Sequence, residues 1–146
     1  RGKMKFLVLN GPNLNLLGLR EPDIYGKSSY RDLCRLIRQN AKKMDVHVRI
    51  RQTNHEGRLV EAIQRAYKRY DGIIINPAAY THTSVAIADA VKAVMIPTVE
   101  VHISDVSARE DFRQISYIRP CCIATVSGMG FEGYIEAMRI LTKNRK

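Results

Sequence analysis

Short apolar runs alternate along this chain with segments of helical periodicity, and that order restricts the fold more than any other feature. Residues 72–76 read GIIIN, an apolar run of the kind found in strands that are covered on both faces. Further strands are predicted at 5–10, 98–104 and 122–128. Residues 46–52, VHVRIRQ, instead alternate strictly between apolar and polar side chains, which is typical of a half-exposed edge strand.

Helices are predicted between most of these strands and after the last one. Such connections place helices on both faces of a parallel sheet. The helix that follows the edge strand should bury Leu59, Val60, Ile63 and Tyr67 on one face. Helix N-caps are expected at Ser28 or Ser29, at Asn54, and at Thr83 or Ser84.

We therefore expect a single α/β domain over residues 1–146, built on a doubly wound, five-stranded parallel sheet. The charged second strand belongs at an edge, which favours the strand order 2-1-3-4-5. Residues 1–3 are expected to be a non-native remnant or a disordered N-terminus. In such sheets, ligands bind at the carboxyl ends of the strands, near the point where the strand order reverses.

The connection after the first strand, residues 10–29, is the least regular part of the chain. Connections of this kind usually have about 2–6 residues, so this one is unusually long. It lies where the fold predicts a binding site, and its length suits a lid. The loop contains Gly11, Pro12, Gly18, Pro22 and Gly26, together with the polar residues Asn13, Arg20 and Tyr25.

Two other strand ends carry candidate catalytic or binding residues. Glu100 and His102 are two residues apart on a predicted strand, so they project from the same face. A carboxylate beside an imidazole holds its orientation and favours its protonated form. This pair would act as a general acid, or equally well as a structural salt bridge. Asn76 and His82 follow the third strand and could face the same site, or form a plain turn and helix cap.

A third candidate group is the pair Arg109 and Arg113, which would share one face if the segment were helical. Two guanidinium groups suit an anionic or polyhydroxylated ligand. The alternative is a surface salt-bridge cluster with Glu110 and Asp111.

Composition narrows the classes of partner. The formal net charge is +10, which would favour nucleic acid, anionic membranes or anionic substrates. The basic residues lie on predicted helix faces without interleaved aromatic residues, so a solvated surface is favoured over a nucleic-acid interface.

No apolar stretch reaches the length of about 18 residues that a membrane span needs. The cysteines Cys34, Cys121 and Cys122 suit neither a disulfide framework nor a zinc site, and they point to a cytoplasmic location.

Five motifs in order, spanning residues 5–141, give the chain a specific resemblance. They are LNGPNLNLLGxREPxIYG, QxNHEG, NPxAYTHTSxAxxDA, VEVHIS with ARExFRxIS, and GxGxxGY. In these motifs the sequence resembles the type II 3-dehydroquinases, or 3-dehydroquinate dehydratases. The resemblance implies a flavodoxin-like fold and a hydro-lyase that removes water from 3-dehydroquinate by anti elimination, giving 3-dehydroshikimate. It also implies a single catalytic domain without metal or cofactor, and trimers that assemble into a dodecamer without nucleic-acid or membrane partners.

The resemblance also assigns roles to individual residues. Tyr25, ionised, would remove the proton α to the ketone, with its pKa lowered by Arg20 beside it. Asn13 would hold the resulting enolate through water. His102 would protonate the departing hydroxyl, oriented by Glu100. For substrate binding, the resemblance implies that the carboxylate is held by Asn76, Ser104 and the backbone of Ile103, and that the ring hydroxyls are held by His82 and Arg113. It further implies that Arg109 lies near Tyr25 and that Asp89 reaches the site from a neighbouring subunit.

The chain departs from the family at a few positions, where Ala78 replaces a usual Gly, Asp105 a usual Asn and Ser107 a common His. An alternative function is a catalytically weak paralogue that binds a quinate-like anion, although the intact Tyr25 and His102 argue against it.

The long loop has a physical rationale in this reading. The ordinary pKa of a tyrosine is about 10, and bringing it close to neutrality takes roughly 4 kcal/mol. Desolvated arginines a few ångströms away can supply that free energy, whereas in open water they are screened. A lid that closes over substrate would create this dry, charged setting only when it is needed.

Overall fold

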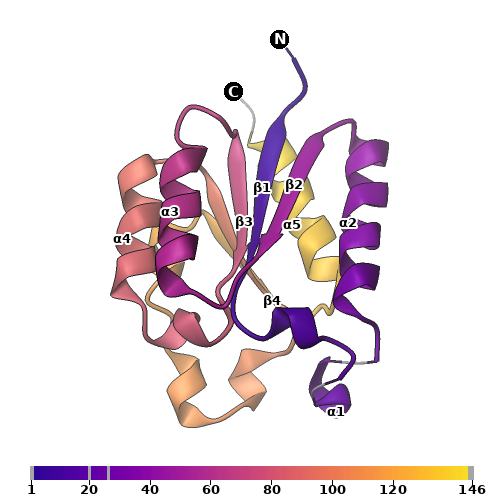
Figure 1. Cartoon of the computed structure of the whole chain (residues 1–146), viewed down its shortest axis with the longest axis vertical. Helices are drawn as coiled ribbons and strands as arrows, with labels where there is room; N and C mark the ends of the chain where they lie inside the picture. Colours follow the sequence, from indigo (N-terminus) through magenta and orange to yellow (C-terminus); the bar gives the residue numbers. More distant parts are fainter. Residues whose placement is uncertain (1, 20, 26, 145–146) are drawn as a thin grey trace.

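Five parallel strands form one sheet in the order β2-β1-β3-β4-β5 in the computed structural model (Figure 1). The structure describes residues 2–19, 21–25 and 27–144, and only the backbone of Tyr25. The strand order confirms the predicted doubly wound, flavodoxin-like sheet. The strands are β1 (Lys5–Asn10), β2 (His47–Gln52), β3 (Gly72–Asn76), β4 (Thr98–His102) and β5 (Ala124–Ser127).

Four helices cover the two faces of the sheet. Helices α2 (Tyr30–Met44) and α5 (Glu132–Lys143) lie on one face, and α3 (Glu56–Ala66) and α4 (Val85–Val94) lie on the other (Figure 1). Each pair closes its own apolar core. Leu33 and Tyr134 pack in the first core, and Leu59 and Ile87 pack in the second, all fully buried.

The carboxyl ends of the strands are surrounded by short helical segments. The four-residue helix α1 (Pro22–Tyr25) lies at this end, opposite the chain termini (Figure 1). The 3-10 helices there and along the adjoining loops are η1 (Leu14–Leu16), η2 (Ala78–His82), η3 (Val106–Ala108), η4 (Asp111–Gln114) and η5 (Arg119–Cys121).

Two of the predicted helix caps are confirmed. Ser29 forms a capping box with Asp32 at the start of α2, since its hydroxyl accepts from Asp32 N at 3.1 Å and Asp32 accepts from Ser29 N at 2.9 Å. Ser84 caps α4, because its side chain accepts from Ile87 N at 3.0 Å. Both helices begin where a short polar side chain can satisfy a free backbone N–H.

The predicted cap at Asn54 and the buried position of Tyr67 are wrong. His55 is the N-cap residue of α3, whereas Asn54 Oδ1 accepts hydrogen bonds from Asn13 N and Gln52 Nε2, both at 3.0 Å. Helix α3 ends at Ala66, so the next residue, Tyr67, leaves the helical face and is 55% exposed.

Three strands are shorter than predicted. β4 ends at His102 because the next two carbonyl groups turn toward the loop after β5. There, Ile103 O accepts from Gly130 N at 3.0 Å, and Ser104 O accepts from Gly128 N at 3.1 Å. β5 covers only residues 124–127, and β2 begins at His47.

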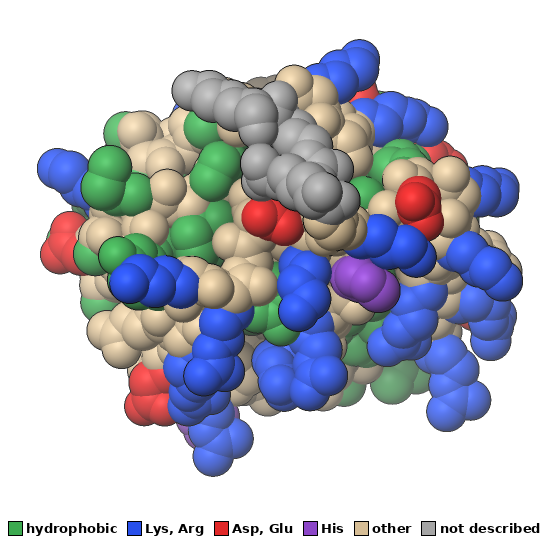
Figure 2. All heavy atoms as spheres, turned by 90° about the horizontal axis from the view of Figure 1, so that it is seen from above, with side chains coloured by type: hydrophobic (Ala, Val, Ile, Leu, Met, Phe, Trp, Pro, Cys, Tyr) green, Lys and Arg blue, Asp and Glu red, His purple; other side chains and the backbone are tan. Residues whose placement is uncertain are grey.

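The edge strand and the basic surface agree with the sequence pattern. On β2, Arg49 and Arg51 are exposed, whereas Val48 and Ile50 are half-buried. Figure 2, which views the molecule from above Figure 1, shows many Lys and Arg side chains on this face with few acidic side chains among them. No helix in the described part of the chain is both long enough and apolar enough to cross a membrane.

Candidate active site

The carboxyl ends of β1, β3 and β4 enclose a small cavity of about 130 Å³, here called the inner pocket. The strand register explains why these ends meet, since Asn10 pairs with both Gln52 and Asn76. Gly11 N also donates to Asn76 O at 2.8 Å, which joins the loops after β1 and β3. The inner pocket is lined by eight of the predicted site residues, namely Asn13, Asn76, His82, His102, Ile103, Ser104, Arg109 and Arg113.

Glu100 and His102 form a buried pair at one side of this pocket. Glu100 is 0% exposed and His102 is 5% exposed. His102 Nε2 is hydrogen-bonded to Glu100 Oε2, and a carboxylate can only accept, so this nitrogen carries the proton. The other ring nitrogen, Nδ1, is therefore the one left to act on a ligand. The predicted placement of the two side chains on one face of β4 is confirmed.

The second histidine of the pocket is also held in one tautomer. His82 Nδ1 lies 2.7 Å from the carbonyl oxygen of Ile115, and a carbonyl accepts but does not donate. Nδ1 therefore carries the proton, and Nε2 has a free lone pair. Burial lowers the pKa of His82 below its ordinary value, although the bond to Ile115 opposes this. A neutral His82 can thus accept a hydrogen bond from a ligand hydroxyl.

Behind the pocket, Asn76 is fixed by a buried chain of hydrogen bonds that sequence reasoning missed. Asn76 Nδ2 donates to Tyr134 Oη at 3.0 Å, and Tyr134 Oη donates to Asn10 Oδ1 at 2.6 Å. Asn76 Oδ1 accepts from Ala78 N at 3.1 Å. Burial raises the pKa of Tyr134 well above its ordinary value, so the phenol remains a donor. The available signal was the tyrosine that ends the last motif.

The two predicted arginines reach the pocket, but not from one helical face. Arg109 follows η3 and Arg113 belongs to η4. Their Nε atoms both approach Glu110 Oε1, at 3.5 Å from Arg109 and 3.1 Å from Arg113. The shared face was expected only if the segment were one helix, and two separate 3-10 helices occupy it instead. Part of the alternative ion-pair cluster is present.

The charge on Glu110 is favoured in this setting. Its backbone hydrogen bond lowers the pKa of the Glu110 carboxyl, and the nearby Arg113 and Arg109 lower it further. Arg109 Nη1 in addition donates to Ser104 Oγ at 3.4 Å. Glu110 thereby helps to hold both guanidinium groups beside the inner pocket.

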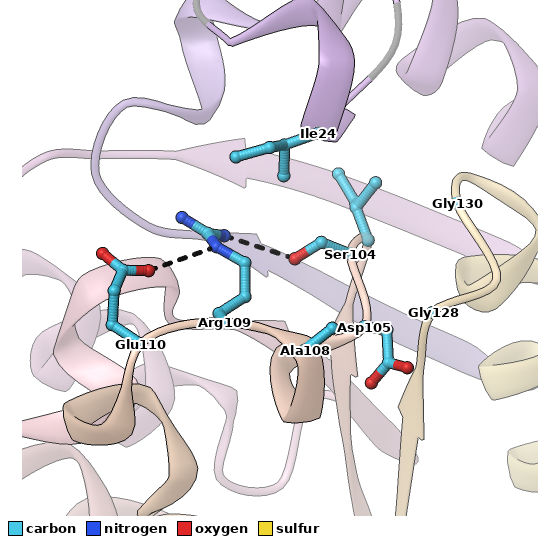
Figure 3. Close-up of a pocket in the computed structure, with 9 residues that line it drawn as sticks. Ile24, Ser104, Asp105, Ala108, Arg109, Glu110, Gly128 and Gly130 are labelled. Carbon is cyan, nitrogen blue, oxygen red and sulfur yellow. Dashed lines mark hydrogen bonds and ion pairs between the residues drawn. The ribbon is translucent and has the colours of Figure 1, made fainter.

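A wider cleft of about 770 Å³, here called the outer cleft, opens next to the inner pocket. Figure 3 shows Ile24 of α1 on one side of it and Ser104 and Arg109 on the other. Ser104, Arg109 and Ile103 line both cavities, so the two spaces meet there. Helix α1, whose last residue is the predicted base Tyr25, therefore borders the site.

Three of the predicted site residues are not seen at either cavity. Arg20 and the side chain of Tyr25 lie outside the described residues. Asp89 is exposed on α4 and lines neither cavity. Among the residues that the structure describes, no three His, Cys, Asp or Glu side chains gather closely enough to hold a metal ion.

Known proteins are similar to this chain in sequence and fold over nearly their whole length. Residues 4–142 match the family described as Dehydroquinase class II. A 3-dehydroquinate dehydratase of Fusobacterium nucleatum is 55% identical over 138 residues, which cover 92% of this chain and 94% of the relative. One from Clostridium acetobutylicum is 49% identical, with 94% and 96% of the two chains covered.

Among solved structures, a type II dehydroquinase from Butyrivibrio crossotus superposes with a TM-score of 0.94 at 48% identity. The match covers 96% of this chain and 98% of that one. The chain belongs to the class II dehydroquinase family.

Proposed function

We propose that this protein is a 3-dehydroquinate dehydratase, which converts 3-dehydroquinate to 3-dehydroshikimate and water. Relatives that carry this name are 49–55% identical over nearly the full chain. The observation that carries the proposal is the buried Glu100–His102 pair, with one histidine nitrogen left for a ligand in the inner pocket. Such a pair is suited to protonating a leaving group.

The reaction we propose begins with removal of a proton. Tyr25, ionised, takes the proton from the carbon α to the ketone, and the electron pair of that C–H bond forms an enolate. Arg20 and Arg109 stabilise the phenolate charge. Asn13, which lines the inner pocket, holds the enolate oxygen through a water molecule.

The second half removes the hydroxyl on the opposite face of the ring. The enolate collapses to the conjugated ketone as the C1–O bond breaks. His102 enters this step with a proton on each ring nitrogen, keeps the Nε2 proton hydrogen-bonded to Glu100 and donates the Nδ1 proton, so that water leaves. Tyr25 then holds one proton more, and His102 one proton fewer, than at the start. Transfer through solvent restores both residues, and neither an oxidant nor a metal is consumed.

The remaining pocket residues would bind the substrate without reacting. Arg113 and the neutral His82 face the same small cavity, and together they can donate to and accept from ring hydroxyls. Asn76, Ser104 and the backbone of Ile103 would hold the carboxylate. Of these, Asn76 has the support of the Tyr134 hydrogen bond, which orients its amide.

We further propose assembly into trimers and then a dodecamer. The exposed position of Asp89 on α4 is compatible with a role in a neighbouring subunit's site. The cysteine pattern favours a cytoplasmic location, and the physiological route would be shikimate synthesis or quinate degradation. Light scattering that finds a fully active monomer would contradict this assembly.

A turnover assay tests the proposed function. Purified protein is mixed with 3-dehydroquinate, and the ultraviolet absorbance of the conjugated product is followed. We expect turnover that survives chelators and survives borohydride added with substrate, because no metal or imine takes part. The control is His102→Ala, which should dehydrate the substrate far more slowly. Calorimetric binding of 3-dehydroquinate without any turnover would instead support the catalytically weak paralogue.

A further inference from the structure

The segment Ile115–Tyr117 connects two parts of the candidate site that are distant in sequence. Ile115 O is the partner of His82 Nδ1 at 2.7 Å. Ser116 Oγ lies 3.1 Å and 3.0 Å from the two carboxylate oxygens of Glu100. Tyr117 N donates to Thr81 O at 3.1 Å. One short stretch of chain therefore contacts both the loop after β3 and the acid–histidine pair on β4.

The direction of the Ser116 hydrogen bonds follows from its third partner. The backbone N–H of Arg119 donates to Ser116 Oγ at 3.1 Å. Because an amide N–H can only donate, it occupies a lone pair of the hydroxyl, and the hydroxyl proton is free to point at Glu100. Ser116 is thus a donor to the carboxylate, and the turn before η5 holds that donor in place.

Glu100 depends on this donor because it has no access to water. Its side chain is 0% exposed, and a buried carboxylate is costly unless it is hydrogen-bonded. In the described part of the chain its hydrogen-bond partners are His102 and Ser116. Without Ser116, the carboxylate would be held only by the imidazole that it is supposed to orient.

We propose that Ser116 is a positioning residue, which acts on His102 through Glu100. This inference rests on the proposed dehydratase function. Ser116 lines neither the inner pocket nor the outer cleft, so it acts without touching the substrate. Its hydroxyl fixes the plane of the Glu100 carboxylate, and the carboxylate fixes the ring of His102 with Nδ1 toward the pocket. The hydroxyl therefore serves the second half of the reaction, in which His102 donates its proton.

This role predicts a selective defect. Ser116→Ala should lower kcat about tenfold, which is the effect expected for loss of one hydrogen bond to a charged group, with little change in KM. Proton abstraction by Tyr25 precedes the step that His102 serves. The ratio of α-proton exchange to dehydration should therefore rise in Ser116→Ala, whereas a general loss of packing would lower both rates together.

The experiment compares three variants with the unaltered protein. Ser116→Ala removes the hydroxyl, Ser116→Thr keeps it, and Ser107→Ala is the matched control, because the Ser107 hydroxyl contacts only Asp105 among the described residues. Turnover, KM and deuterium uptake into recovered 3-dehydroquinate are measured in D₂O. We expect the exchange ratio to rise in Ser116→Ala alone and to be restored in Ser116→Thr.

A second readout does not depend on turnover. The proton resonance of His102 Nε2–H, observed by NMR in the ligand-free protein, should shift in Ser116→Ala and stay in place in Ser116→Thr and Ser107→Ala. If Ser116→Ala does not fold, Ser116→Cys, a weaker donor of similar size, takes its place with smaller changes in the same direction. An unchanged resonance together with an unchanged exchange ratio overturns the inference. An inactive unaltered protein that shows the expected NMR shift would instead contradict the proposed function.

Discussion

Gly11 and Pro77 approach so closely that any Cβ at position 11 would stand 2.5 Å from the carbonyl oxygen of Pro77. Both sides of this contact are backbone, so no side-chain rotation can relieve it. The contact joins the loops that follow β1 and β3, alongside the hydrogen bond from Gly11 N to Asn76 O at 2.8 Å. Asn13 and Asn76, which line the inner pocket from these two loops, are brought together by it.

Gly11→Ala should therefore lower the free energy of unfolding by about 3 kcal/mol, because the added methyl group forces the two loops apart. Gly57→Ala is the matched control, since nothing lies within 4 Å of a Cβ at that position in α3. That control should gain about 0.5–1 kcal/mol from its better helix propensity. Urea unfolding of both variants measures the difference. A Gly11→Ala protein as stable as Gly57→Ala would refute the steric argument.

Replacing Ala78 with glycine should stabilise the protein. Its φ is 53°, a left-handed conformation that costs a residue with a Cβ about 1–2 kcal/mol. Glycine removes that strain but loses about 0.4–1 kcal/mol through its freer unfolded chain. Ala78→Gly should thus raise the free energy of unfolding by about 0.5–1 kcal/mol. Ala62→Gly, within α3, should lower it by a similar amount, and equal losses in both variants would count against strain at Ala78.

The pH dependence of His82 follows from the direction of its pKa. Burial lowers this pKa, so the unfolded chain takes up the proton at a higher pH than the folded one. Stability from neutral His82 is therefore present above its ordinary pKa of about 6.5 and is lost as the pH falls. NMR titration should give a midpoint below that ordinary value. Between pH 7.5 and 5.5, about one unit on either side of the ordinary pKa, the free energy of unfolding should fall less in His82→Gln than in the unaltered protein. An equal fall in both proteins would argue against a lowered pKa of His82.

The fold was largely predictable because its signals are local. Each core strand has its own apolar run, and the polar alternation of β2 marks it as an edge strand. The differences from the prediction have two causes, a partner that is far away in sequence and a helix that ends or is interrupted earlier than the pattern indicates. Asn54 does not cap α3 because it bonds to Asn13, 41 residues earlier. Arg109 and Arg113 do not share a helical face, because two separate 3-10 helices interrupt the segment.

The candidate site was predicted where motifs identified residues, and missed where residues act through others. Tyr134 contacts Asn10 across 124 positions, and no periodicity or spacing could indicate that pairing. Ser116 lies in a quoted motif, yet its contact with Glu100 emerges only when the turn before η5 is folded against β4. Supporting residues of this kind can be identified only in the folded structure, because their role depends on which residue they contact and not on their own side-chain chemistry.

Tyr25→Phe tests the proposed base. The change removes a single hydroxyl and keeps the ring, so substrate binding should be nearly unchanged. Turnover should fall by about 10³-fold, within the range that general base catalysis contributes. Tyr67→Phe is the matched control, because Tyr67 is 55% exposed and lines neither cavity. Near-normal turnover in Tyr25→Phe would remove Tyr25 from its proposed role.

Arg20 tests whether the base needs a cation beside it. If Tyr25 works as an anion, its charged form must be favoured near neutral pH, and a nearby guanidinium supplies the attraction. Arg20→Ala should therefore cut turnover and move the acidic limb of the pH–rate profile to higher pH, because more alkaline solution is then needed to ionise the phenol. Arg20→Lys should rescue only in part, since a compact ammonium lacks the planar guanidinium fork. Arg65→Ala removes an exposed arginine paired with Glu61 and should leave the profile where it was. If Arg20→Ala lowers turnover without moving the acidic limb, Arg20 does not stabilise the base, and the long loop after β1 must contribute in some other way.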